Sequence, residues 1–103
     1  MYKLCYFVPE SHLEQTKSAL FESGAGRIGD YDQCAWQCLG TGQFRPLEGS
    51  DPFLGSHGAV ETVAEYKVEL VCEDELIRDV IRALRSSHPY EEPAFEVYRL
   101  EDF

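Results

Sequence analysis

Apolar residues recur along the chain in short runs that predict four β-strands. Residues 4–8 form a compact apolar run typical of a buried strand. Residues 31–39 and 94–100 also indicate strands, and residues 63–72 alternate clearly between apolar and polar side chains. The alternation predicts one face built from Tyr66, Val68, Leu70 and Cys72 and an opposite face with Glu65, Lys67 and Glu69. It likewise predicts a packed strand face from Cys34, Trp36 and Cys38.

Two further segments have the three- and four-residue apolar spacing of amphipathic helices. The first covers residues 11–23, and Ser11 followed by Glu14 predicts a capping box at its start. The second begins at Asp74, which we expect to cap it. It should end near Ser87, because Pro89 disfavours helical geometry at the residue before it.

The segment Gly24-Ala25-Gly26-Arg27-Ile28-Gly29 matches the dinucleotide-binding pattern G-x-G-x-x-G. That pattern binds pyrophosphate when a strand precedes it and a helix follows it. Here the order is reversed, so the glycines lie at a helix C-terminus, whose partial negative charge repels phosphate. Gly24 is therefore predicted to end the helix, and a dinucleotide site is not expected.

Glycine and proline mark the middle of the chain as irregular. The run Gly40-Thr41-Gly42 predicts a tight reversal into a short hairpin arm at residues 43–45. Residues 46–59 hold two prolines and three glycines and predict a long loop.

The order strand, helix, strand, strand, helix, strand predicts an α+β fold of the ferredoxin-like, split βαβ class. We expect one domain over residues 1–103, with two helices on one face of an antiparallel sheet and an extra hairpin. The other face of the sheet is left uncovered, so self-association through that face or through a strand edge is expected.

Charge and hydropathy limit the partners. Nineteen acidic residues against nine basic ones give a net charge of −10, which disfavours binding to nucleic acid and to anionic membranes. No apolar run approaches the roughly 20 residues of a membrane span, and the N-terminus is too brief for a signal peptide. These features lead us to expect a cytoplasmic protein.

Four cysteines, at positions 5, 34, 38 and 72, raise the question of a disulfide or a zinc site. On one strand, Cys34 and Cys38 would have Cα atoms about 13 Å apart, too far for a disulfide. Cys5 and Cys72 lie on separate strands that could be neighbours. In a cytosolic protein we expect both to be reduced core residues.

The turn His88-Pro89-Tyr90-Glu91 resembles the corresponding turn of the CutA proteins. Together with Gly24-Ala-Gly-Arg-Ile-Gly-Asp-Tyr31, Gly40-Thr-Gly-Gln-Phe44 and Pro46, it resembles the PII/CutA-like domain inserted in YqfO-type members of the Nif-three-like family. These proteins are also called GTP cyclohydrolase 1 type 2 homologs. The resemblance implies the ferredoxin-like fold and a trimer, with a dimer as the next choice. In that family the dinuclear metal centre belongs to the flanking halves, so the resemblance implies a free-standing insert without that centre.

Two sets of residues are candidates for binding. Exposed N–H groups near Gly26 and Gly29, with Arg27 and Arg45, could hold a small anionic ligand such as a phosphate or carboxylate; we add Tyr31 and Tyr90 to this set. A tightly turned connection also needs glycine for purely conformational reasons. The candidate ligands for a divalent metal are His88 with Glu91 and His57 with Glu61. Against this, His88 could simply cap carbonyl groups in a rigid turn.

Three hypotheses for function follow. The first is an oligomeric PII/CutA-like regulatory module that binds a small ligand or ion without catalysis. The second is a divalent-metal-binding protein or metal-dependent hydrolase. The third is an assembly adaptor that docks on a separate Nif-three-like protein through the uncovered sheet face.

Overall fold

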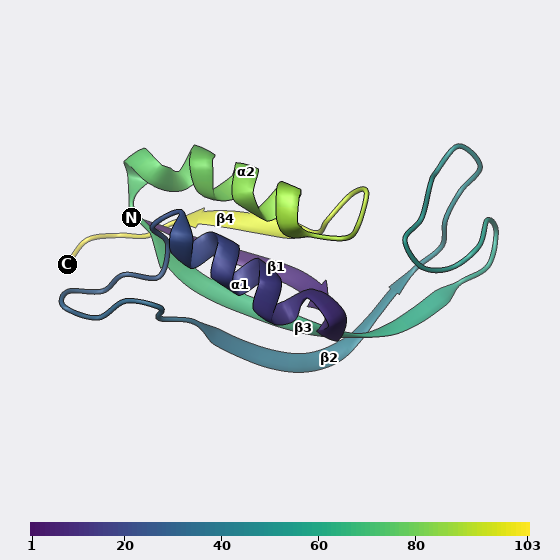
Figure 1. Cartoon of the computed structure of the whole chain (residues 1–103), viewed down its shortest axis with the longest axis horizontal. Helices are drawn as coiled ribbons and strands as arrows, with labels where there is room; N and C mark the ends of the chain where they lie inside the picture. Colours follow the sequence, from purple (N-terminus) through teal and green to yellow (C-terminus); the bar gives the residue numbers. More distant parts are fainter.

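The computed structural model describes all 103 residues and has the predicted order of elements. The elements are β1 (Tyr2–Pro9), α1 (Leu13–Glu22), β2 (Trp36–Phe44), β3 (Glu61–Cys72), α2 (Ile77–Ser87) and β4 (Phe95–Arg99). Short 3-10 turns, η1 (Glu10–His12) and η2 (Asp74–Leu76), precede the two helices. The sheet is antiparallel in the order β2-β3-β1-β4, and both helices lie on one face of it (Figure 1). This confirms the predicted ferredoxin-like α+β fold.

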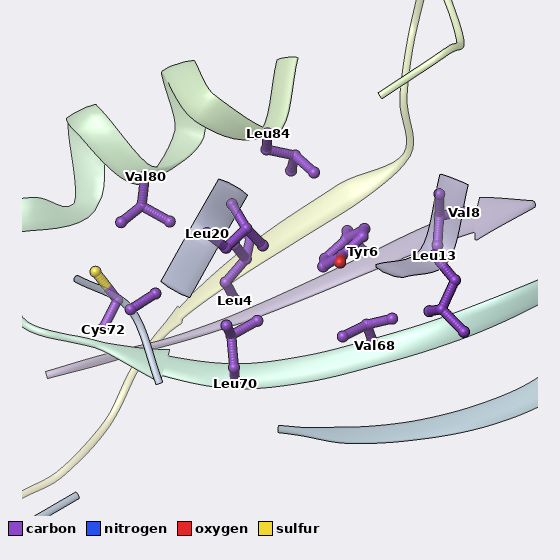
Figure 2. Close-up of a cluster of buried hydrophobic side chains, with 11 residues drawn as sticks. Leu4, Tyr6, Val8, Leu13, Leu20, Val68, Leu70, Cys72, Val80 and Leu84 are labelled. Atoms are coloured by element: carbon purple, nitrogen blue, oxygen red, sulfur yellow. The ribbon is translucent and has the colours of Figure 1, made fainter. Parts of the chain in front are cut away.

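The core lies between the helices and the sheet face that they cover (Figure 2). Alternate residues of the two central strands point into it, because side chains in a strand have a period of two. Strands β1 and β3 and the two helices supply Leu4, Tyr6, Val8, Leu13, Leu20, Val68, Leu70, Cys72, Val80 and Leu84. Full burial of one such aliphatic side chain stabilises the fold by about 1.5–3 kcal/mol. The predicted apolar face of residues 66–72 is thereby confirmed.

The glycine-rich segment leaves a helix and enters a strand, as predicted. Gly24 has a φ of 100° and its N–H donates to Phe21 O at 3.0 Å, while Ala25 N–H donates to Leu20 O at 3.1 Å. These two bonds form a Schellman motif, the common C-terminal cap of a helix. After this segment the next helical turn is η2, which begins only at Asp74, so the segment lacks the helix N-terminus that a dinucleotide site requires.

Neither predicted N-cap is formed. Ser11 Oγ bonds to His12 Nδ1 at 2.8 Å, and α1 begins at Leu13 without a side-chain cap. Asp74 lies in η2, where its carboxylate accepts hydrogen bonds from the N-terminal ammonium group and from Arg99. In both cases a 3-10 turn leads the chain into the helix, and the would-be capping side chain has another partner.

The predicted hairpin at Gly40-Thr41-Gly42 is wrong. Strand β2 runs straight through these residues and pairs with β3 as far as Phe44 opposite Glu61. A Cβ atom at Gly42 would lie 1.9 Å from Glu65 Oε1, so this glycine makes room for the Glu65 side chain. The chain reverses later, through the long loop predicted at residues 46–59.

Beyond the pairing of Pro9 with Glu65, β2 and β3 continue without β1. The result is a two-stranded arm that projects past the rest of the sheet (Figure 1).

Strand β2 also begins later than predicted. It starts at Trp36, because residues 28 and 31 form a separate turn closed by two backbone hydrogen bonds of 2.9 and 3.0 Å. Cys34 therefore lies outside the strand, and Trp36 and Cys38 are exposed on the face that the helices do not cover. The packed face predicted from Cys34, Trp36 and Cys38 is not formed within one chain.

All four cysteines are free, as predicted. Cys72 pairs with Tyr2 and faces the core, whereas Cys5 pairs with Glu69 and faces the opposite side of the sheet. Both thiols are buried, and burial raises the pKa of Cys72 to about 11. None of the helices is both long and apolar enough to cross a membrane.

Candidate functional site

A groove of about 980 Å³ lies on the open face of the sheet, the face away from the helices. Its floor is made by β2 and by the open-face residues of β3, and residues 46–54 and 90–94 supply its other walls. The long loop folds back toward the α2–β4 turn, and Asp51 N–H donates to Glu91 Oε1 at 3.1 Å. The two segments lie at the same end of the molecule (Figure 1).

Aromatic rings from separate parts of the chain meet along this groove. Phe44 and Tyr90 have ring centroids 5.9 Å apart, and Phe53 and Tyr90 have centroids 6.3 Å apart. His12 packs edge-on against Phe53 at 5.6 Å. We call Phe44, Phe53 and Tyr90 the aromatic cluster. It joins the end of β2, the long loop and the α2–β4 turn into one surface.

His88 holds the turn that carries Tyr90. The residue is only 6% exposed; its Nε2–H donates to Phe7 O at 2.6 Å, and its Nδ1 accepts from Tyr90 N–H at 3.1 Å. Burial lowers the pKa of His88, so the neutral ring is favoured. Both ring nitrogens are therefore occupied by hydrogen bonds within the protein.

The predicted metal ligands do not converge. Glu91 binds the backbone of the long loop, and His57 donates from Nε2 to Ser50 O at 2.8 Å. Glu61 lies at the start of β3, opposite Phe44. No group of three or more His, Cys, Asp and Glu side chains is arranged to hold a metal ion. The geometry thus lends the metal site no support, and it stays a prediction.

The predicted ligand-binding residues separate into two places. Gly26, Arg27, Gly29 and Tyr31 lie on the α1–β2 connection, where Gly26 N–H donates to Val71 O near the end of β3. Arg45 and Tyr90 line the groove, beside the start of β3. The ten residue steps from Glu61 to Val71 span about 33 Å of strand. Arg27 and Arg45 therefore cannot hold the same anion.

Tyr90 has the most unusual environment in the groove. Its hydroxyl group is buried beside the carboxylate of Glu65, outside ideal hydrogen-bond geometry. Burial raises the pKa of Tyr90 most strongly, and the interaction with Glu65 and the negative charge of Glu61 raise it further. The phenol therefore stays protonated near neutral pH, with Glu65 as its nearest acceptor.

Acidic side chains outnumber basic ones around the groove. Glu65, Glu69, Glu91 and Glu92 line it together with Arg45 and Lys67. None of these six takes part in an ion pair, because the four ion pairs of the chain lie elsewhere. The groove therefore combines an aromatic wall with uncompensated carboxylates. Phe44, Phe53 and Glu65 were not predicted as site residues from the sequence, because the contacts that bring them together join separate parts of the chain.

Comparison with known proteins places this fold among homologues. No family model matches the sequence. The chain is 46% identical over 100 residues to the GTP cyclohydrolase 1 type 2 homolog of Halalkalibacterium halodurans. The aligned region covers 97% of this chain and 27% of that protein. The chain spans about a quarter of the length of the curated relatives it matches.

Solved structures agree with this. The Bacillus cereus protein related to NIF3 superposes with a TM-score of 0.84 at 40% identity, over 98% of this chain and 26% of that one. CutA1 from Pyrococcus horikoshii superposes with a TM-score of 0.72 at 16% identity, over all of this chain and 86% of that one, which shows a common fold. The chain is therefore a homologue of one segment of the GTP cyclohydrolase 1 type 2 homologs of the NIF3 family, and that segment has the CutA/PII-like fold.

Proposed function

We propose that this domain is a self-associating regulatory module that binds a small ligand in the groove of its open sheet face and does no chemistry of its own. The observation that carries this proposal is the groove itself. Its volume of about 980 Å³ lies at the upper end of the range of small-molecule sites. An apolar lining with a few polar groups, here including the buried Tyr90 hydroxyl and the Glu65 carboxylate, is the usual composition of such sites.

Self-association is supported by the surfaces that one chain leaves uncovered. Trp36 and Tyr98 are each more than half exposed, and both lie on the open face, on the two outer strands. The two-stranded arm beyond Pro9 is not backed by a third strand, and an isolated pair of strands is only marginally stable in water. A second copy that packs on the open face would cover both features and would also close over the groove, so a ligand bound there would lie between two chains. A trimer is the assembly that the family resemblance implies.

Light scattering coupled to size exclusion tests the assembly. We expect a mass of three chains for the wild type and of one chain for Tyr98→Glu, which places a charge on the open face. Tyr31→Glu is the matched control, because Tyr31 is exposed on the α1–β2 connection and away from the sheet. A wild-type monomer, or an assembly that Tyr98→Glu leaves intact, would contradict this part of the proposal.

Ligand binding is tested by adding nucleotides, organic acids, amines or divalent metals. The measurements are the shift in thermal unfolding temperature and the fluorescence of Trp36. Trp36 is the only tryptophan and lines the groove, so its emission reports on binding there. We expect at least one compound to stabilise the wild type and Phe53→Ala to abolish the effect, with Tyr31→Ala unaffected. Stabilisation by no compound, or stabilisation that survives in Phe53→Ala, would refute binding in the groove.

A further inference from the structure

A short hairpin in the α1–β2 connection displays two large apolar side chains. Ile28 N–H donates to Tyr31 O at 2.9 Å, and Tyr31 N–H donates to Ile28 O at 3.0 Å. Residues that exchange both backbone bonds lie directly opposite each other, with their side chains on the same side of the hairpin. Ile28 is 54% exposed and Tyr31 is 76% exposed. We call residues 28–31 the apolar hairpin.

The apolar hairpin is fixed to the fold, although neither of its two large side chains belongs to the core. Gly26 N–H donates to Val71 O and Gly26 O accepts from Cys34 N–H, both at 2.8 Å, so the connection is tied to the end of β3. Tyr31 takes part in none of the aromatic pairs or cation–π contacts of the chain. A defined backbone that presents adjacent exposed apolar side chains is typical of a protein-binding surface.

Both ends of the chain lie beside the apolar hairpin. Val71, which binds Gly26, pairs with Lys3 at the start of β1, and Leu100 N–H donates to Met1 O at 3.0 Å. The two ends are therefore neighbours, at the end of the sheet where the α1–β2 connection is tied. Figure 1 shows both ends and this connection on one side of the molecule, with the long loop on the opposite side.

The length of the relatives indicates what lies next to this end of the domain. The aligned region covers 97% of this chain but 27% of the Halalkalibacterium halodurans homologue, and the Bacillus cereus structure gives 98% and 26%. About three-quarters of each relative therefore lies outside the domain and joins it at its first or last residues. Because such a tether creates a high effective concentration, a contact of two side chains is enough to hold the two parts together.

We propose that the apolar hairpin docks into an apolar pocket on the remaining part of a NIF3-family protein and so fixes this domain relative to that part. The surface is separate from the groove, to which the apolar hairpin contributes no residue. Arg27, Asp30 and Asp32 are exposed around the two side chains and take part in no ion pair. Two acids against one base favour a pocket whose rim carries basic side chains.

The test uses a chimera, the full-length Halalkalibacterium halodurans homologue in which this chain replaces the matching segment. Hydroxyl-radical footprinting compares the solvent access of Tyr31 in the chimera and in the 103-residue chain. We expect Tyr31 to be oxidised at least about fivefold more slowly in the chimera, because docking buries it. Leu47 is the internal control, because it is 62% exposed on the long loop and its oxidation rate should be the same in both proteins.

A double variant separates docking from folding. Ile28→Ser with Tyr31→Ser should leave the mass and the urea midpoint of the 103-residue chain unchanged, because neither side chain belongs to the core. In the chimera it should speed cleavage by proteinase K at the junctions at least about fivefold, because an undocked domain exposes its linkers. Leu47→Ser with Val60→Ser is the matched control, since these residues are 62% and 60% exposed at the opposite end, and cleavage should not change.

Three results would overturn the proposal. The first is equal oxidation of Tyr31 in both proteins, or cleavage of the chimera that the double variant does not accelerate. The second is a lower mass of the 103-residue chain in the double variant, which would show that the apolar hairpin joins copies of this chain instead. The third is a chimera that does not reach the mass of the unmodified homologue, because the domain would then not fit the part that it is proposed to contact.

Discussion

Replacing Gly26 by alanine should destabilise the fold, because this glycine is needed for two separate reasons. Its φ of 81° lies in the left-handed region, which costs a residue with a Cβ atom about 1–2 kcal/mol. The new Cβ would also lie 2.9 Å from Cys34 O and 2.9 Å from Phe21 Cε1. The backbone cannot easily move away, since Gly26 N–H donates to Val71 O and Gly26 O accepts from Cys34 N–H, both at 2.8 Å.

The steric part of this cost can be isolated with a neighbouring glycine. Gly29 also has a positive φ, of 56°, but a Cβ atom there meets nothing within 4 Å. Gly29→Ala should therefore cost about 1–2 kcal/mol from backbone conformation alone. Overpacking adds about 1–3 kcal/mol at Gly26, so Gly26→Ala should lower the free energy of unfolding by about 2–5 kcal/mol.

Urea denaturation at one protein concentration measures both changes, because the stability of an assembled protein depends on concentration. With a slope of about 1–3 kcal/mol per molar urea, the midpoint for Gly26→Ala should fall about 1 M below that for Gly29→Ala. Equal free energies of unfolding for the two variants would refute the argument that Gly26 is set by close packing. They would leave a role in ligand binding as the better explanation for this glycine.

Three further predictions concern buried polar groups. Burial lowers the pKa of His88 below its ordinary 6.5, so the unfolded chain binds a proton more readily than the folded one. The free energy of unfolding should therefore fall as the pH drops below about 6.5. His88→Gln should flatten that dependence in denaturation curves between pH 7.5 and 5. Thr16→Val removes the partner of the Tyr6 hydroxyl, bonded at 2.8 Å in the core, and should cost about 1–3 kcal/mol; adding Tyr6→Phe should cost less than the sum of the two single changes, and strict additivity would contradict the contact. Cys5 and Cys72 are only 3% and 2% exposed, and burial raises the pKa of both thiols. They should therefore resist a thiol reagent until urea unfolds the chain. Rapid labelling of all four cysteines in the native protein would be inconsistent with the structure.

The parts of the fold that sequence predicted correctly depend on neighbouring residues. Alternation over residues 66–72 identified the core face of β3, and Pro89 placed the end of α2 at Ser87. Gly24 indicated the direction of the chain, because a glycine in left-handed geometry ends a helix whatever lies around it.

Two of the incorrect predictions, those for Asp74 and Gly42, share one cause, which is that the local signal had a competing tertiary partner. Asp74 is a good capping residue, yet its carboxylate binds the N-terminus and Arg99, which the sheet brings near it. Gly42 indicated a turn, but it is a strand residue that accommodates Glu65. Glycine is compatible with either use, and nothing in the adjacent sequence distinguishes them.

The sequence by itself determined the order of the elements, the two faces of the central strands and the direction of the chain through the glycine segment. These follow from side-chain periodicity and from the backbone freedom of glycine and proline, which act within a few residues. Only the tertiary structure decided which distant residues meet. It separated Arg27 from Arg45 by the length of β3, and it brought Phe53 to Tyr90 across 36 intervening positions of the chain. A binding site depends on which distant residues the fold brings together, because its chemistry depends on distances in space that the spacing of residues along the chain does not specify.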